Sequence, residues 1–378
     1  MRFYRWEKAG CTVLFTMMIS LSLSAQTGTY TGGSNGADEL FATARKFISN
    51  GDYSNAILVL NRAIEQDPQN LEYRKQLAFT YFLRRDLGRA DQLIRELLGR
   101  DDADVQTYQI AGNIYQAQRD SKKAERNYKR GLRKFPNSGE LNNELGLLYF
   151  NEQNYTDALR CWTKGIRVAP SYPGNYYNAA RTYYYSKDKF WAIIYGEIFI
   201  NLERMSTRTA EMRGILLESY KYLFNNPDAL SVELPPLQNA SGDAAAGQQP
   251  SGEALSFRKA ILNTLAKSAT VITRGITPET LIMLRTRFIL DWTRFYSLYY
   301  PYALFDFQRQ LLKDGLFEAY NQWIFGPAAN QAAYRTWTGL HKAEYDRLMK
   351  YLQENSLQPR AGEFYQNEKI DYEADNNT

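Results

Sequence analysis

Histidine and cysteine are almost missing from this sequence: its 378 residues include one histidine, His341, and two cysteines, Cys11 and Cys161. Zinc sites in proteins use several cysteine and histidine ligands, so we expect no metal site. A Ser-His-Asp or Cys-His catalytic arrangement would have to use His341, which falls on an apolar helical stripe and which we interpret as a core or interface residue. We expect Cys161 to be a semi-buried helix residue rather than a reactive thiol.

Motifs for nucleotide, metal or acyl chemistry are also missing. The sequence contains no GxxxxGK[ST], GxSxG or HExxH pattern, and "TGGSNG" near the N-terminus follows no predicted strand. The net charge of +5 is modest for this length, and no run of five or more Lys and Arg residues occurs, so we expect no nucleic acid partner. We therefore predict a non-enzymatic protein without a cofactor and assign no catalytic residue.

The first 25 residues have the pattern of an export signal. "MRFYRWEKAG" is basic, the following "CTVLFTMMISLSLSA" is apolar and short, and it ends on the small residue Ala25. We expect residues 1–25 to be a cleaved signal peptide, with an uncleaved N-terminal anchor as the alternative, and residues 26–36 to be a flexible lead-in. We then expect the mature protein in the periplasm, either free or associated with the cell envelope, without a membrane span.

What the sequence does contain is a repeat with a period of 34 residues. One register holds only alanine, at Ala56, Ala90, Ala124, Ala158 and Ala192. A second register holds only small residues, at Ala44, Ala78, Gly112, Gly146, Ala180 and Gly214. Two helices approach closely only where one of them presents a small side chain, so these registers predict helix pairs with close crossings. Pro68, Pro136 and Pro170 recur where each second helix should end.

This pattern resembles the tetratricopeptide repeat (TPR) family, whose unit is a helix-turn-helix of 34 residues. "ELGLLYFNEQNYTDALRCWTKGIRVAP" (residues 144–170) is the unit most similar to the family consensus. The resemblance implies an all-α, right-handed superhelical array over residues 37–225, with five repeats and a closing helix from about Thr207. The predicted repeats are 37–70, 71–104, 105–138, 139–172 and 173–206. The fifth departs from the pattern, with Gly196 at a large apolar position and Arg204 in place of proline.

The period stops after the array. Residues 226–254 are rich in Pro, Gly, Ser, Ala and Gln and are predicted to be a linker. Residues 255–356 return to helical spacing, with a helix start at Thr277 and Pro278. We expect a separate small bundle of about four helices there, either free of the array or docked on its end. The tail, residues 357–378, is polar and acidic and is predicted to be disordered.

The TPR resemblance also implies where a partner binds. In this family the first helices of successive repeats line a concave groove, and the family's groove positions carried onto this chain mix amides with aromatics. Such side chains pair with the backbone of a peptide and receive its apolar side chains. We therefore expect a protein or peptide partner and a scaffold or adaptor function in an envelope complex. The predicted binding residues are Lys75, Phe79, Phe82, Gln109, Asn113, Gln116, Asn143, Phe150, Tyr177, Arg181 and Tyr184.

Three alternatives remain open at the level of sequence. The groove aromatics could pack under the linker or the C-terminal helices instead of binding a partner. The C-terminal aromatics around Trp292 and Tyr300 could bind envelope glycans, although their spacing favours a core. The C-terminal helices could also form a carboxylate-dependent enzyme, with the repeats positioning the substrate.

Overall fold

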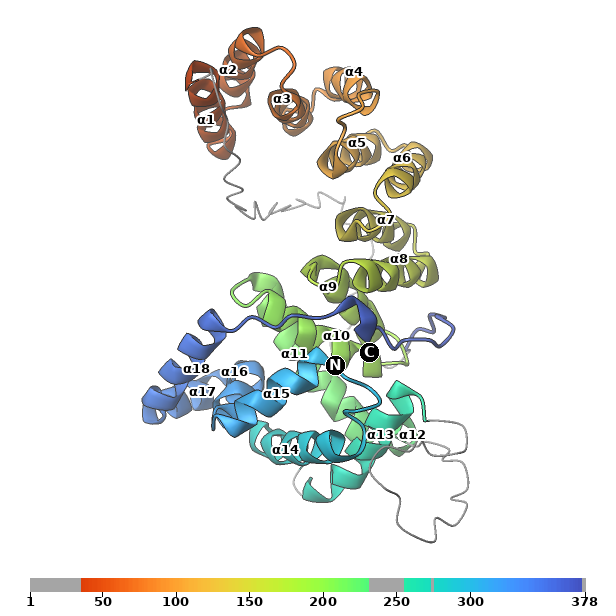
Figure 1. Ribbon diagram of the computed structural model, residues 1–378, viewed down its shortest axis with the longest axis vertical. Helices are drawn as coiled ribbons and strands as arrows, with labels where there is room; N and C mark the ends of the chain where they lie inside the picture. The colour runs from red at the N-terminus through yellow and green to blue at the C-terminus, as the bar shows by residue number, and fades with distance from the viewer. Residues whose placement is uncertain (1–34, 231–254, 273–274, 376–378) are drawn as a thin grey trace, which may run out of the picture.

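The computed structural model describes residues 35–230, 255–272 and 275–375, and these residues form helices and no sheet. Ten helices pair as five consecutive hairpins, and α11 (Thr207–Asn225) closes the series (Figure 1). The all-α superhelical array of five repeats and a closing helix is thereby confirmed. The hairpins are α1 (Asn35–Ser49) with α2 (Tyr53–Gln66), α3 (Leu71–Leu83) with α4 (Leu87–Leu98), α5 (Val105–Ala117) with α6 (Ser121–Lys134), α7 (Gly139–Asn151) with α8 (Tyr155–Val168), and α9 (Pro173–Tyr184) with α10 (Phe190–Leu202).

The turns inside the first four hairpins share one conformation. Each second helix starts after Asp52, Asp86, Asp120 or Asn154, whose side chain accepts a hydrogen bond from a backbone N–H of the first turn. The residue before each cap has a positive φ of 76°, 65°, 61° or 62°, at Gly51, Arg85, Arg119 and Gln153. A left-handed residue followed by a capping side chain reverses the chain in few residues. The period of 34 therefore extends to the backbone of the turns.

The small-residue register marks real close crossings in the third and fourth hairpins. A Cβ atom added to Gly112 would lie 2.1 Å from Cζ of Tyr128, and one added to Gly146 would lie 2.3 Å from Nε1 of Trp162. The rings of the second helices thus occupy the space that a side chain would need. This packing explains why the register admits only glycine or alanine.

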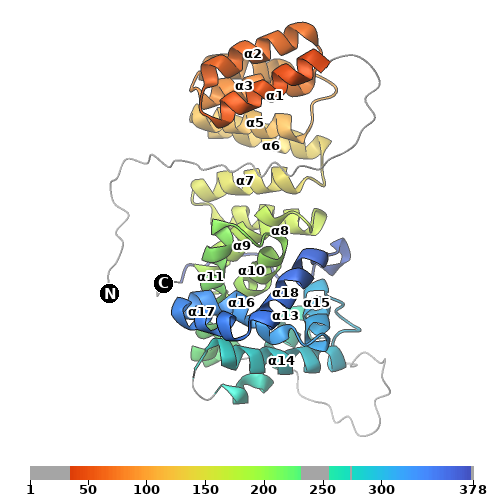
Figure 2. The ribbon, with the colours of Figure 1, turned by 90° about the vertical axis from the view of Figure 1, so that its left-hand side faces the viewer.

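The fifth repeat is where the array joins the C-terminal helices. Twelve of the 13 residues of α10 are buried, because the repeats cover one side of this helix and the C-terminal helices cover the other (Figure 2). One continuous apolar core runs from Ala158 to Leu357. The C-terminal helices, α13 (Phe257–Ser268) and those after it, are therefore packed on the end of the array and share its core.

The remaining C-terminal helices are α14 (Pro278–Phe295), α15 (Ala303–Lys313), α16 (Phe317–Ala329), α17 (Gln331–Leu340) and α18 (Lys342–Glu354), and short helical turns lie at Pro227–Leu230, Ala269–Val271 and Ala361–Glu363. There are more of these helices than the four expected. The helical run is interrupted between α15 and α16 at Gly315, where φ is 66°, and between α17 and α18 at His341, the C-cap of α17. Pro327 lies inside α16 rather than at its end.

A buried polar network ties α10 to the C-terminal helices. The Glu197 carboxylate on α10 accepts hydrogen bonds from Arg285 on α14, from Gln308 on α15 (2.6 Å) and from Tyr320 on α16 (2.9 Å). Arg285 also donates to the side chain of Asn321, and all these side chains are buried. A buried carboxylate with an arginine partner and two further donors is well satisfied, so the network fixes how the four helices meet.

The tail also differs from its prediction. Residues 357–375 are not disordered but lie across α8 and the α9–α10 turn, and they return to the array after α18 (Figure 1). Aromatic anchors account for this order: Phe364 lies under Arg167, with the guanidinium 4.4 Å from the ring centroid, and Tyr365 packs on Phe257.

The predicted signal peptide, most of the lead-in and most of the linker lie outside the described residues. In the part of the chain that the structure does describe, no helix has both the length and the apolar character needed to cross a bilayer.

Candidate functional site

The candidate site is the inner side of the array, which the first helices of the repeats form. Figure 1 shows the repeats following a curved path, with α3, α5, α7 and α9 on its inner side and α4, α6 and α8 on its outer side. We call this side the first-helix face. The helices that form it carry the eleven predicted binding residues: Lys75, Phe79, Phe82, Gln109, Asn113, Gln116, Asn143, Phe150, Tyr177, Arg181 and Tyr184.

Three of these residues are buried and hold neighbouring repeats together. Lys75 donates to Asp104 (2.6 Å), which caps α5, and to Gln106 (2.7 Å) on α5, the first helix of the next repeat. The side chain of Asn143 accepts from Asn178 at 2.8 Å, and Tyr177 donates to Glu211 at 2.5 Å.

Gln109, at the same position of its own repeat, donates to Glu144 at 3.4 Å. Each of these side chains reaches the helix that follows its own hairpin. The four contacts therefore form a polar ladder between successive repeats, defined by Lys75, Gln109, Asn143 and Tyr177. These residues were predicted to face a ligand, but in the structure Lys75, Asn143 and Tyr177 are buried and form hydrogen bonds within the protein.

The half-buried part of the first-helix face is aromatic at α3. The rings of Phe79 and Phe82 stack at 5.8 Å with an interplanar angle of 24°. They are neither exposed nor fully buried, so each ring packs partly on the core and keeps part of its surface open. On α5, which packs against α3, Gln109, Asn113 and Gln116 are also half-buried. An apolar platform and a row of amides therefore adjoin on neighbouring helices.

Farther along, the first-helix face becomes more engaged with the protein itself. Gln116 donates to the Tyr128 hydroxyl at 3.0 Å, and Phe150 packs edge-on against Tyr155. Arg181 pairs with Glu211 at 3.1 Å. The ring of Tyr184 lies 5.5 Å from the Lys189 ammonium. Phe79 and Phe82 on α3 differ from these residues, because the contacts described for them are with each other and with the apolar core.

One titratable residue in the ladder escaped the sequence prediction. Glu144 is buried beside Tyr128 and Tyr172, and this burial raises the pKa of its carboxyl group to about 7, although hydrogen bonds from Gln109 and Asn143 act in the opposite direction. No cation lies among the groups that shift it. One indication of this residue was present in the sequence, because Glu144 directly follows Asn143, which was predicted to line the groove.

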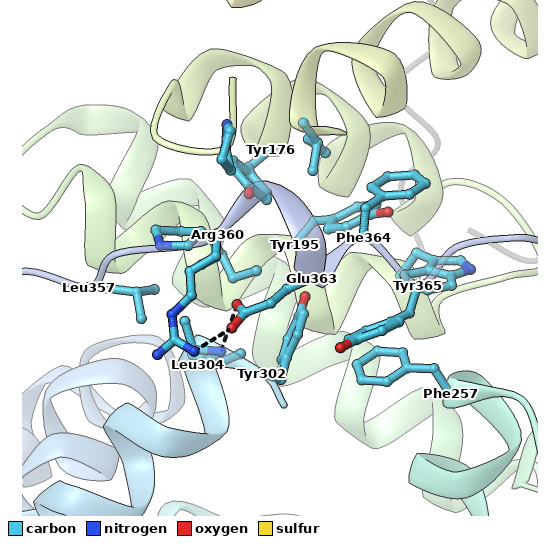
Figure 3. Close-up of a pocket in the computed structure, with 16 residues that line it drawn as sticks. Tyr176, Tyr195, Phe257, Tyr302, Leu304, Leu357, Arg360, Glu363, Phe364 and Tyr365 are labelled. Carbon is cyan, nitrogen blue, oxygen red and sulfur yellow. Dashed lines mark hydrogen bonds and ion pairs between the residues drawn. The ribbon is translucent and has the colours of Figure 1, made fainter. Parts of the chain in front are cut away.

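A small cavity lies under the tail, between α8, α10 and α15 (Figure 3). Its volume of about 20 Å³ has room for roughly one water molecule. Glu363 lies at its edge, accepts from the Ala303 backbone N–H at 2.9 Å and pairs with Arg360 at 3.0 Å. Burial raises the pKa of Glu363, but Glu363 is the only carboxylate among the described lining residues. This cavity therefore offers no paired carboxylates for the enzyme alternative.

A second depression lies on the outer side, and its lining includes Arg100, Arg130, Arg133 and Lys134. These cations gather there because the end of α4 presents backbone carbonyl groups. Arg130 donates to the Leu98 carbonyl at 3.1 Å, and Lys134 donates to the carbonyls of Asp101 and Ala103 at 2.8 and 2.9 Å. These cations satisfy carbonyl groups at and beyond the C-terminus of α4.

The C-terminal aromatics divide between core and surface. Trp292, which the glycan alternative would need at the surface, is 2% exposed, whereas Phe295 and Tyr299 are 53% and 36% exposed. His341 is not a core residue: it stacks on Trp337 at 4.6 Å and contacts Glu344 at 2.8 Å. Cys161 is half-buried, as expected, and burial raises the pKa of its thiol to about 12.

Comparisons with known proteins agree with the repeat architecture. Two family profiles described as tetratricopeptide repeat match residues 47–111 and 111–173. No curated protein matches the sequence.

Similar solved structures include the TPR protein TTC0263 of Thermus thermophilus (16% identity, TM-score 0.40, 49% of this chain and 98% of that one) and PilF of Pseudomonas aeruginosa (18%, 0.42, 51% and 86%). Another is PilW, described as a type IV pilus biogenesis factor (16%, 0.41, 52% and 90%). The two family matches lie on helix pairs that repeat every 34 residues, so residues 47–173 of this chain belong to the tetratricopeptide repeat family.

Proposed function

We propose that this protein is a non-enzymatic scaffold of the bacterial cell envelope and that it holds an extended segment of a partner protein on its first-helix face. Tetratricopeptide repeats are protein-interaction modules, which supports the general part of the proposal. The observation that carries the specific part is the stacked pair of Phe79 and Phe82 beside the amides of α5. Apolar side chains of a partner would bury the open surface of the two rings, and its backbone would pair with the amides.

The location in the envelope rests on the N-terminal sequence. A basic start, a short apolar run and a small residue at Ala25 are typical of an export signal. Export would place the array in the periplasm, where the partner would be another exported protein or the periplasmic segment of a membrane protein.

The test compares partner recovery by matched variants. The mature chain, the double variant F79A/F82A and the control L58A are each used to capture proteins from envelope extracts, and recovery is measured by quantitative mass spectrometry. Leu58 is an apolar residue of α2 that is 51% exposed, so its replacement removes apolar surface outside the first-helix face.

We expect F79A/F82A to lose the recovered partner at least tenfold and L58A to retain it. Equal recovery by all three chains would overturn the assignment to this face. Because both phenylalanines also contact the core, thermal unfolding of each chain is measured first, and capture is performed at least 15 °C below the lowest midpoint.

A further inference from the structure

The last residues of the tail that the structure describes are bound to the array as a peptide ligand would be. Residues 372–375 lie extended along the α9–α10 turn, with an antiparallel bridge between Ser186 and Ala374. The Lys187 N–H donates to the Glu373 carbonyl at 3.0 Å, and the Asp375 N–H donates to the Tyr185 carbonyl at 3.0 Å. Such backbone pairing holds an extended segment whatever its side chains are, so side-chain contacts must supply the selectivity.

The strongest of those contacts is made by Lys189. Its ammonium group donates to the Asp375 carboxylate at 2.6 Å and to the carbonyls of Tyr184 and Ser186 at 2.8 and 3.2 Å. The side chains of Lys189 and Asp375 are 2% and 6% exposed. The rings of Tyr184 and Tyr222 lie 5.5 and 4.5 Å from the ammonium.

A cation buried this deeply needs an anion, because burying an unpaired charge is costly. Two carbonyls and two ring faces orient the ammonium but do not neutralise it. The surroundings of Lys189 are therefore built for a carboxylate that arrives from outside the turn.

A second anchor lies three residues before the carboxylate. The ring of Tyr372 packs on Tyr155 at 4.8 Å, its backbone N–H donates to the Thr156 hydroxyl at 3.1 Å, and its own hydroxyl donates to the Tyr185 carbonyl at 3.3 Å. Between the anchors, Glu373 pairs with Lys187 at the exposed rim. The recognised pattern is thus an aromatic residue, two spacer residues and a carboxylate.

The α9–α10 turn also differs from the four turns before it. Asp188 stands where Asp52, Asp86, Asp120 and Asn154 cap their helices, but it pairs with Arg258 at 2.5 Å instead, and α10 starts two residues later, at Phe190. The fifth turn is therefore open along its backbone, which is what an added extended segment requires.

We propose that the α9–α10 turn is a recognition site for an extended acidic polypeptide segment of the pattern aromatic-x-x-carboxylate, and that the chain's own Tyr372–Asp375 is a resident, displaceable occupant. The site takes the corresponding segment of a partner protein once the tail is released. It lies apart from the α3–α5 part of the first-helix face and does not depend on the function proposed above.

The experiment uses the full mature chain and a fluorescent peptide of residues 367–375, with binding followed by anisotropy. Three chains are compared: the unmodified chain, Y372A/D375N, in which the resident occupant is weakened, and D371N as a matched control. Asp371 is an exposed acid that pairs only with Lys369 among the described residues. A peptide with asparagine at position 375 tests the carboxylate.

We expect Y372A/D375N to bind the peptide at least tenfold more tightly than the unmodified chain, and D371N to match the unmodified chain. Adding Lys189→Met to Y372A/D375N should abolish binding, and the asparagine peptide should bind at least tenfold more weakly. Equal binding by Y372A/D375N and the unmodified chain, or equal binding of the two peptides, would overturn the proposal.

A second measurement needs no variant. Hydrogen exchange of the Lys187 amide, which donates to the tail, reports release of the resident segment. Exchange faster than that of the α10 amides, and slowed by excess peptide, is expected for a displaceable occupant. Exchange of the Lys187 amide only by global unfolding would overturn displaceability.

Discussion

The buried carboxyl group of Glu144 makes the stability of the array depend on pH, and a single substitution should remove this contribution. Its pKa in the folded protein is about 7, against an ordinary value of 4.5, because burial disfavours the charged form. The folded chain therefore keeps this proton to higher pH than the unfolded chain does. Between these two pKa values the folded state binds more protons, so stability falls as pH rises through that range.

The magnitude follows from the shift. A difference of about 2.5 pKa units corresponds to about 3 kcal/mol once both states are ionised, at about 1.4 kcal/mol per unit. Between pH 5 and pH 8 the loss amounts to about 2.5 kcal/mol, because part of the unfolded population is already ionised at pH 5. The variant E144Q has nearly the same shape, stays neutral and keeps a side-chain oxygen that accepts from Gln109, so it should not show this loss.

The assay is urea unfolding of the wild-type chain and E144Q at pH 5, 6, 7 and 8, followed by circular dichroism. We expect E144Q to gain about 2.5 kcal/mol relative to wild type between pH 5 and pH 8, mainly between pH 5 and pH 7. Taking the difference between the two chains removes the contribution of other titrating groups. A constant difference between the two chains at all four pH values would refute the reasoning.

Three further changes have calculable consequences for the free energy of unfolding. Gly146→Ala should destabilise by about 1–3 kcal/mol, because the new Cβ meets the Trp162 ring. Arg285→Met should cost about 3–5 kcal/mol by leaving Glu197 buried without its cation, and Glu197→Met in the same chain should recover much of this loss. Asp120→Ala should cost about 1 kcal/mol through loss of the cap of α6. Chemical denaturation of each chain measures all three.

Each of these predictions has a control within the chain. Gly214 occupies the same register as Gly146 but has no atom within 4 Å of an added Cβ, so Gly214→Ala should stabilise by about 0.5–1 kcal/mol. Arg287→Met removes an exposed cation of the same helix as Arg285 and should change stability by less than about 0.5 kcal/mol. Asp120→Asn retains a capping oxygen and should be nearly neutral. A loss at Gly214 equal to that at Gly146 would contradict the crossing argument.

The repeat architecture could be predicted from the sequence because its cause is local and periodic. A close helix crossing requires a small residue in every hairpin, so Gly112 and Gly146 revealed their places without knowledge of the contacts they make. The left-handed residues were not predictable in this way. Arg85, Arg119 and Gln153 are residue types that seldom adopt positive φ, and the turn imposes it on them.

The candidate site could be predicted only in part. The family's groove positions identified the right helices, but whether a side chain faces a ligand or the next repeat depends on what stands about 34 residues later. Lys75, Asn143 and Tyr177 find partners there and are buried, whereas Phe79 and Phe82 do not and stay half-buried.

The junction with the C-terminal helices was missed for a different reason. The α10 sequence "FWAIIYGEIFINL" has no polar face, which indicates a helix covered on both sides. The 34-residue period alone led instead to its interpretation as a repeat that departs from the family pattern. The tail was missed because its composition is polar, while its order depends on pairs such as Lys189 with Asp375, 186 residues apart. No local pattern contains such a pair.

The most direct test of the proposed function is site-specific photocrosslinking in living cells. A photoreactive phenylalanine analogue replaces Phe82 on the first-helix face or, as the control, Leu58 on α2, and crosslinked peptides are identified by mass spectrometry. We expect position 82 to crosslink to one extended segment of one exported protein and position 58 not to do so. The same crosslinked proteins at both positions, or none at position 82 in cells where the substituted chain is exported and folded, would contradict it.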